Sequence, residues 1–278
     1  IKEHWHGVWD GRETQKYKQE INRRMEAMAQ ELPKAEIKWR RPTEEEMEAA
    51  IRKASGSGGT DGWIGEEARA MPRTAIQLFN QLTERWEVAG EVPSGMREAR
   101  QVNLSKPGKE VDGKLAAANT RPITVFSVMW RVYCSAWVSS PAVREWQLKV
   151  LPEEICGGQG AEGAEEASAA LLDAFQEMGL LATLDYSQCY DLMDPATTLG
   201  LMRKAGFPVG LVRVLEKVWC HQKRWVSWDN YVHPEPLEVR AATPQGDPWG
   251  PFSLNLWMVI GRKAVEDKIV RAEMMEEP

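Results

Sequence analysis

The sequence lacks any run of about 18 consecutive apolar residues, so it predicts neither a membrane-spanning helix nor a membrane partner. It also lacks the paired basic and apolar regions of a secretory signal peptide. Its four cysteines are scattered without Cys-x-x-Cys spacing, which indicates neither a disulfide framework nor a zinc ribbon. We therefore expect an intracellular protein in a reducing compartment. Because Ile1 stands where an initiator Met would, we expect an internal piece of a longer product.

Several catalytic signatures are also missing from the sequence. There is no Gly-x-x-x-x-Gly-Lys-Ser/Thr loop and no Gly-x-Ser-x-Gly elbow, which argues against a P-loop nucleotidase and an α/β-hydrolase. His4 and His6 have the spacing of a metal pair, but only two other histidines exist and no carboxylate lies nearby in a ligand pattern. We expect these two to be loop or tag-like histidines.

Positive charge is scarce overall and unevenly placed. The net charge of -6 argues against a generic nucleic-acid binder, because contacts to phosphate require Lys and Arg. Residues 97–131 nevertheless hold seven basic residues against three acidic ones. A second basic group follows at 203–224, where either a nucleic-acid surface or an ordinary solvated helix face explains the pattern. Thirteen tryptophans could stack on bases or fill the core.

The residue patterns predict a helix-rich α+β protein with a small antiparallel sheet. A hydrophobic content of 43% over 278 residues is enough for a large core. Thr43 and Glu46 form a capping-box pattern, and Pro141 should kink or split a long helical stretch. We expect helices at 12–32, 43–54, 66–89, 127–150, 162–178, 194–206 and from 208 onward, with strands at 101–105 and 181–185 and a hairpin within 224–243.

Two segments are the best candidates for a chemical site. Residues 181–191 read Leu-Ala-Thr-Leu-Asp-Tyr-Ser-Gln-Cys-Tyr-Asp, an apolar strand that delivers Asp185 to its C-terminal end. Residues 242–251 read Ala-Thr-Pro-Gln-Gly-Asp-Pro-Trp-Gly-Pro, a turn that opens an apolar helix. Further short motifs precede them in the chain: Gly59-Thr60-Asp61-Gly62, Lys106-Pro107-Gly108-Lys109 and Arg121-Pro122-Ile123.

Together, and in this order, these motifs resemble the reverse transcriptase domain of non-LTR (LINE-type) retrotransposons, and they are similar to group II intron reverse transcriptases. The resemblance spans about residues 55–265. It implies a right-hand polymerase fold and RNA-directed DNA synthesis, a nucleotidyl transfer, on an RNA template with a DNA primer and dNTPs. The implied division is a helical N-terminal extension at 1–54, fingers with the start of the palm at 55–180, and an incomplete palm at 181–278 whose hairpin 224–243 returns to the fingers.

The resemblance assigns the catalytic metal to Asp185. Asp185 and the backbone carbonyl of Tyr186 would hold Mg²⁺, or Mn²⁺, in a two-metal phosphoryl transfer. The simpler alternative is a strand-end Asp that caps the following turn. Cys189 stands where the family usually has Ala, and Asp191 is expected to serve the local structure.

The resemblance also implies a nucleotide site. Lys106 and Arg121 would contact the triphosphate, and Tyr190 would lie beneath the sugar and exclude a 2′-hydroxyl. Gln245 and Gly246 would contact the nucleotide and let the backbone approach the template and primer. The alternatives are solvated loop charges, a half-buried packing Tyr, and a glycine needed only for the turn.

The template contact is assigned to Gly59, Asp61 and Gly62, although a Gly-Asp-Gly loop is common without any such role. Two departures from the family stand out. The Gln159 motif lacks its usual Phe, and the Tyr-x-Asp-Asp carboxylate pair is absent. We therefore expect this chain alone not to polymerise, and we explain the missing pair by truncation.

Two alternatives to an active polymerase stay open. One is a catalytically inactive retroelement remnant that binds RNA or a protein partner. The other is an unrelated helical interaction protein, in which Asp185 and Gln245 would lie far apart. If the element is eukaryotic, the expected compartment is the nucleus.

Overall fold

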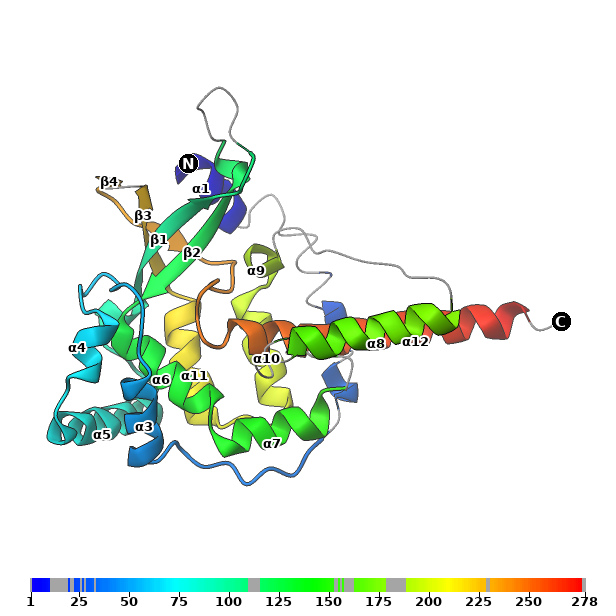
Figure 1. Ribbon diagram of the computed structural model, residues 1–278, viewed down its shortest axis with the longest axis horizontal. Coiled ribbons are helices and arrows are strands. Elements are labelled where there is room, and N and C mark those ends of the chain that lie inside the picture. The colour runs from blue at the N-terminus through cyan, green and yellow to red at the C-terminus, as the bar shows by residue number, and fades with distance from the viewer. Residues whose placement is uncertain are drawn as a thin grey trace.

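The computed structural model describes residues 2–10, 20, 23–25, 27, 29–32, 34–109, 116–152, 155, 157, 163–178, 189–228 and 231–276. Its fold is α+β and helix-rich, as the sequence predicts (Figure 1). The α-helices are α1 Lys2–Asp10, α3 Glu44–Arg52, α4 Gly65–Arg69, α5 Arg73–Ala89, α6 Val128–Val138, α7 Pro141–Val150, α8 Gly163–Met178, α9 Cys189–Leu192, α10 Pro195–Lys204, α11 Val209–Trp219 and α12 Gly250–Glu276. The strands are β1 Glu98–Ser105, β2 Thr120–Phe126, β3 Gln222–Trp228, β4 Tyr231–Val232 and β5 Leu237–Val239, and short 3-10 helices include η1 Ala29–Glu31, η2 Ser94–Arg97 and η3 Ala117–Asn119.

The sheet is mixed, which corrects the expectation of an antiparallel one. Strands β1 and β2 form an antiparallel hairpin, whereas β3 runs parallel to β1. The strand order is β2-β1-β3-β4, and β5 also pairs with β3. Parallel pairing requires a crossover connection, and here helices α6 to α11 lie between β2 and β3 in sequence. The arrangement leaves β2 at one edge of the sheet.

Most helix boundaries follow the local signals in the sequence. The Thr43 hydroxyl accepts a hydrogen bond from the Glu46 backbone amide, and the Glu46 carboxylate accepts one from the Thr43 backbone amide, which completes the predicted capping box. Pro141 divides the stretch 127–150 into α6 and α7 as expected. The single helix predicted over 66–89 is instead two, α4 and α5, because Pro72 stands at the N-cap of α5 and interrupts the helical hydrogen bonds.

Helix α1 was not expected, and its histidines lie in a helix rather than a loop. Trp5 and Trp9 are one turn apart and stack at a centroid distance of 5.1 Å, and both side chains are buried. They pack against Val226, Leu237 and other apolar residues of β3 and β5. The i, i+4 spacing of the two tryptophans was the available signal. The neighbouring prediction of a helix at 12–32 falls largely outside the described residues, apart from η1.

Tryptophan forms much of the core. Seven tryptophans are almost completely buried: Trp5, Trp9, Trp130, Trp137, Trp146, Trp219 and Trp249. Each indole buries a large apolar area, at about 25 cal/mol per Å² removed from water. These seven side chains therefore stabilise the fold and have no exposed ring face on which a nucleic-acid base could stack.

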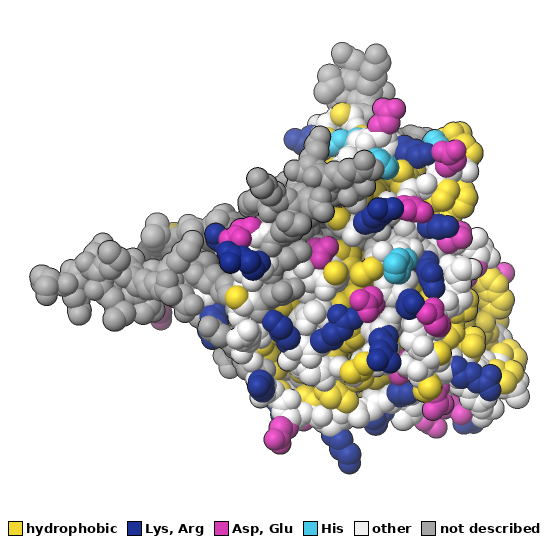
Figure 2. All heavy atoms as spheres, turned by 180° about the vertical axis from the view of Figure 1, so that it is seen from behind, with side chains coloured by type: hydrophobic (Ala, Val, Ile, Leu, Met, Phe, Trp, Pro, Cys, Tyr) yellow, Lys and Arg dark blue, Asp and Glu magenta, His cyan; other side chains and the backbone are white. Residues whose placement is uncertain are grey.

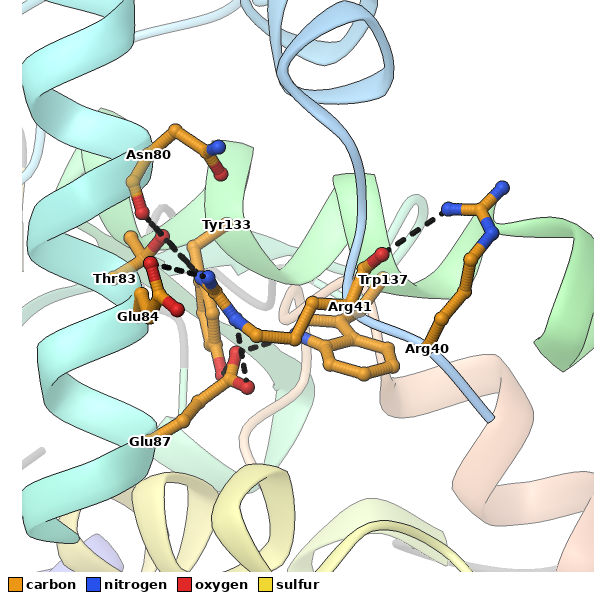
Figure 3. A network of polar contacts seen from close by, with 8 residues as sticks. All are labelled: Arg40, Arg41, Asn80, Thr83, Glu84, Glu87, Tyr133 and Trp137. Carbon is orange, nitrogen blue, oxygen red and sulfur yellow. Dashed lines mark hydrogen bonds and ion pairs between the residues drawn. The ribbon is translucent and has the colours of Figure 1, made fainter. Parts of the chain in front are cut away.

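A buried carboxylate joins the segment before α3 to two core helices. Glu87 of α5 is 8% exposed and accepts hydrogen bonds from Tyr133 Oη at 3.0 Å and Trp137 Nε1 at 2.9 Å, both on α6. Arg41 contributes an ion pair of 3.0 Å from its Nε atom (Figure 3). Burial raises the pKa of Glu87, and these partners oppose the rise. The network fixes residue 41 against α5 and α6.

Candidate functional site

The 242–251 turn is attached to the free edge of β2. The Thr124 amide of β2 donates a hydrogen bond of 2.8 Å to the carbonyl oxygen of Gln245. Gly246 has a φ of 110°, and a Cβ atom there would lie 2.7 Å from the Thr124 carbonyl oxygen. Only glycine fits both this backbone conformation and this close approach. The sheet edge therefore fixes the position of Gln245 and Gly246.

Tyr190 lies against the same turn. The Thr243 amide donates a hydrogen bond of 3.0 Å to the Tyr190 carbonyl oxygen. A Cβ atom on Gly250 would lie 3.3 Å from Cε1 of the Tyr190 ring. The ring is half-buried, and burial raises the pKa of its hydroxyl, so that Tyr190 is a neutral phenol at physiological pH. The end of the 181–191 segment and the start of α12 are thus in contact.

Arg121 lies on the sheet face that the turn approaches. Side chains alternate along a strand, so Arg121 and Ile123 share one face of β2, about 7 Å apart along the strand. The Ile123 Cγ2 atom would lie 3.5 Å from a Cβ at Gly246. Arg121 is exposed and stands opposite Leu104 of β1. Within the described part of the chain, its guanidinium has no hydrogen bond or ion pair.

Lys106 occupies the hairpin turn that connects β1 toward β2. Gly108 in this turn has a φ of 69°, as a tight Lys-Pro-Gly-Lys turn requires. The Lys106 Nζ atom donates a hydrogen bond of 3.2 Å to the Ala118 carbonyl oxygen. Lys106 would have to leave this partner to contact a ligand, so the structure does not bring the Lys106 amine to the 242–251 turn.

The loop that contains Gly59, Asp61 and Gly62 is held where β2 meets α6. A Cβ at Gly59 would lie 2.6 Å from the Phe126 carbonyl carbon, so the two backbones are in direct contact. The Ser127 hydroxyl donates a hydrogen bond of 2.6 Å to Asp61 Oδ2. Asp61 is thereby engaged in positioning the loop at the start of α6.

Arg131 of α6 fixes the preceding part of this loop. Its guanidinium donates to the carbonyl oxygens of Ser55 at 3.1 Å and Ser57 at 2.7 Å. A cavity of about 530 Å³ lies beside it between α3 and α6, and Gly246 and Pro248 contribute to its lining. Ser55, at the start of this loop, and the 242–251 turn therefore border one hollow region, whereas Gly59, Asp61 and Gly62 do not line it.

Asp247 was not identified from the sequence, yet it anchors the turn. Its buried carboxylate accepts hydrogen bonds from Trp130 Nε1 at 2.8 Å, Trp219 Nε1 at 3.3 Å and the Trp249 amide at 2.9 Å. Burial raises the pKa of Asp247, and these donors oppose the rise. The carboxylate links the turn to α6 and α11, which is a structural role.

A second buried polar cluster lies beneath α1. Asp191 is buried and accepts a hydrogen bond of 2.8 Å from Trp9 Nε1, which agrees with its expected structural role. Arg224 lies 4.5 Å from the centroid of the Trp9 ring and donates to Gln222 and Gln101. Burial lowers the pKa of Arg224 to about 10. Arg224 therefore does not belong to the exposed basic group that the sequence suggested.

The other bases of that group are partly paired. Arg203 contacts Glu216 at 2.6 Å, and Lys217 contacts Glu91 at 2.6 Å. On the face shown in Figure 2, Lys and Arg side chains are interspersed with Asp and Glu. This mixed pattern is typical of a solvated helix face and gives no single field of positive charge.

The predicted metal ligands, Asp185 and Tyr186, lie outside the described residues. Within the described part of the chain, no group of three or more His, Cys, Asp or Glu side chains is placed to hold a metal ion. Asp247 lies within the 242–251 turn and Asp191 follows Tyr190. Both carboxylates are buried and accept indole N–H bonds, and this does not suit metal ligation.

Over its described ranges, the chain contains no helix whose length and apolar content would carry it across a membrane. Comparisons with protein-family models and with curated proteins find no match to this sequence. Any assignment of function therefore depends on the motifs and on the contacts among them.

Proposed function

We propose that this chain is part of an RNA-directed DNA polymerase, the reverse transcriptase domain of a retroelement. The proposal depends on one observation, the meeting of three segments far apart in the sequence. Tyr190 contacts the 242–251 turn, and this turn is bonded to the edge of β2 beside the face that carries Arg121. The same segments supply the nucleotide site in the family that the motifs resemble.

In this proposal, each of the three segments has a distinct task. The half-buried, neutral Tyr190 ring lies beneath the incoming sugar and leaves no room for a 2′-hydroxyl. Gly246 has no side chain and lets the backbone approach the nascent base pair. Arg121 is exposed and donates a charge-assisted, bidentate hydrogen bond to the triphosphate.

In this proposal, the residues that would hold the catalytic metal are Asp185 and Tyr186, the latter through its backbone carbonyl. Bound Mg²⁺ would supply electrostatic stabilisation of the phosphoryl transfer. The described carboxylates at and beside the turn, Asp247 and Asp191, do not fit this role. The contribution derived from the described residues is to bind and orient the nucleotide.

Nucleotide binding by the chain itself tests this assignment. A labelled RNA-template and DNA-primer duplex is titrated with the chain, and the complex is then titrated with dNTP and Mg²⁺. Arg121→Ala should weaken dNTP binding about tenfold or more, because a charge-assisted hydrogen bond contributes about 1.5–3 kcal/mol. The matched control is Arg144→Ala on α7, which removes an exposed arginine outside the sheet and outside the 242–251 turn. This variant should leave dNTP binding unchanged. Equal losses in both variants would contradict the assignment.

Primer extension distinguishes an active polymerase from an inactive remnant. The sequence lacks the Asp pair that the resemblance implies, so the assay compares this chain with a longer product of the same gene that includes such a pair. Extension by the longer product, lost in Asp185→Asn, supports a polymerase. In that background, Tyr190→Ala should weaken the preference for dNTP over rNTP. A folded but inert longer product would instead indicate a remnant that binds RNA or a protein partner.

A further inference from the structure

A second cavity, separate from the candidate site, lies where strands β1 and β3 begin. Its volume is about 540 Å³, and η2, β3 and β5 contribute to its walls. This size is within the range of about 300–1,000 Å³ that is typical of small-molecule sites. Four of its residues carry or can carry positive charge: Arg97, His221, Lys223 and Arg240.

The position of this cavity sets it apart from the nucleotide site proposed above. The 242–251 turn is bonded to the outer edge of β2, whereas the cavity adjoins β3 and β5 on the other side of β1. No residue of the 242–251 turn lines this cavity, and it shares no lining residue with the cavity between α3 and α6. A ligand in this cavity would therefore be bound independently of the reaction at the turn.

The acidic residues of the lining are already engaged. Glu238 contacts Nη2 of Arg240 at 3.2 Å, which leaves the other guanidinium N–H groups of Arg240 available to a ligand. Glu98 accepts a hydrogen bond of 3.1 Å from Trp225 Nε1. Lys223 is exposed, and within the described part of the chain its side chain has no hydrogen bond or ion pair. Lys223 stands opposite Glu238 in the β3–β5 register but makes no close ion pair with it, so its amine is available to a ligand.

Arg97 is the second group with unused donor capacity. Its Nη2 atom contacts Glu91 at 3.4 Å, while its buried Nε atom has no hydrogen-bond partner. Glu91 is shared with Lys217 at 2.6 Å, so one carboxylate serves two cations. The Lys217 hydrogen bond is the largest cause that lowers the pKa of Glu91, which keeps this carboxylate ionised.

The chemistry of the remaining lining argues against other ligands. Burial raises the pKa of the Cys220 thiol to about 12, so it is protonated and is neither a nucleophile nor a thiolate ligand. Three Lys and Arg side chains disfavour a cation, and no aromatic side chain lines the walls for an apolar ligand. An anion remains the ligand that suits these walls.

We propose that this cavity binds a phosphate group, with Arg97, Lys223 and Arg240 as its anchors. Guanidinium groups suit bidentate contacts to phosphate oxygens, and the lysine adds a mobile point charge. The phosphate comes from a free nucleotide or from the backbone of a nucleic-acid strand. This site does not depend on polymerase activity.

The test is calorimetric titration of the intact chain with three probes: inorganic phosphate, ATP and a single-stranded 12-nucleotide RNA. The test variant is the double substitution Lys223→Glu and Arg240→Glu, both at exposed side chains. The control is Arg144→Glu with Lys149→Glu, which makes the same change in charge on α7 and outside the cavity. Far-UV circular dichroism and urea midpoints establish that both variants are folded.

We expect the test variant to bind at least tenfold more weakly and the control within twofold of the original chain. If the original chain binds phosphate or ATP and the test variant loses this binding, the source is a free nucleotide. Binding of RNA alone identifies a nucleic-acid backbone as the source. The slope of log binding constant against log salt concentration should then decrease by about one phosphate contact for each basic side chain that is removed. The proposal is overturned if no probe binds the original chain, or if both variants bind equally well.

Discussion

Replacing Gly246 by Ala is the most direct test of how the 242–251 turn is held against the sheet. The substitution adds one methyl group at a backbone φ of 110°, which L-residues rarely adopt. The added Cβ would lie 2.7 Å from the Thr124 carbonyl oxygen. The obstacle is backbone rather than a flexible side chain, so the turn itself has to move.

The expected loss of unfolding free energy in Gly246→Ala has two contributions. A non-glycine residue in a sparsely populated backbone region costs about 1–3 kcal/mol. Moving the turn away from β2 also breaks the 2.8 Å hydrogen bond from the Thr124 amide to Gln245, a net loss of about 0.5–1.5 kcal/mol. We therefore expect Gly246→Ala to lower the free energy of unfolding by about 2–4 kcal/mol. With a urea m-value of about 3 kcal/mol/M, the midpoint should fall by about 1 M.

Two glycines elsewhere in the chain serve as controls. Gly108 has a φ of 69° and open space around its Cβ position, so Gly108→Ala measures backbone strain without a clash. Gly200 lies within α10 and also has open space, so Gly200→Ala should raise the free energy of unfolding by about 0.5–1 kcal/mol. The assay is urea denaturation followed by far-UV circular dichroism. If Gly246→Ala unfolds at the same urea concentration as Gly108→Ala, the close approach to Thr124 is refuted.

Three further predictions concern the buried polar groups. Because burial raises the pKa of Asp247, the folded state favours its protonated form, and this stabilisation is present in acid and lost as pH rises through the raised pKa. Asp247→Asn should therefore be more destabilised, relative to the original chain, at pH 4 than at pH 7, as urea midpoints will show. Arg41→Ala should cost about 2–4 kcal/mol because it leaves the Glu87 carboxylate buried without its cation. Adding Glu87→Gln should recover part of this loss, and additive effects in a double-mutant cycle would contradict the coupling. Trp9→Phe keeps an aromatic ring but removes the N–H donor to buried Asp191. The thermal midpoint should therefore fall by an amount equivalent to about 1–3 kcal/mol of stability. An unchanged midpoint would show that this hydrogen bond is unimportant.

Local signals in the sequence were sufficient for most helix boundaries. The Thr43 capping box, the break at Pro141 and the start of the helix predicted at 194–206 all appear in the structure where the sequence predicts them; Asp194 caps that helix and Pro195 is its first residue. These features depend on hydrogen bonds and steric limits within a few residues. Gly246 belongs to the same class, since a turn with a positive φ favours glycine whatever surrounds it. The break at Pro72 was equally local and was missed.

The sequence by itself determined the helix-rich α+β class, the bounds of several helices and the identity of the turn that carries Gln245 and Gly246, whereas α1 and β2 were not predicted. Tertiary structure alone decided that β3 runs parallel to β1, because pairing across a long crossover is not encoded in strand alternation. It also decided that Arg224 and Asp247 are buried. A charged side chain near a strand or turn is expected at the surface, and only partners from distant segments, here indole and amide groups, stabilise it in the interior.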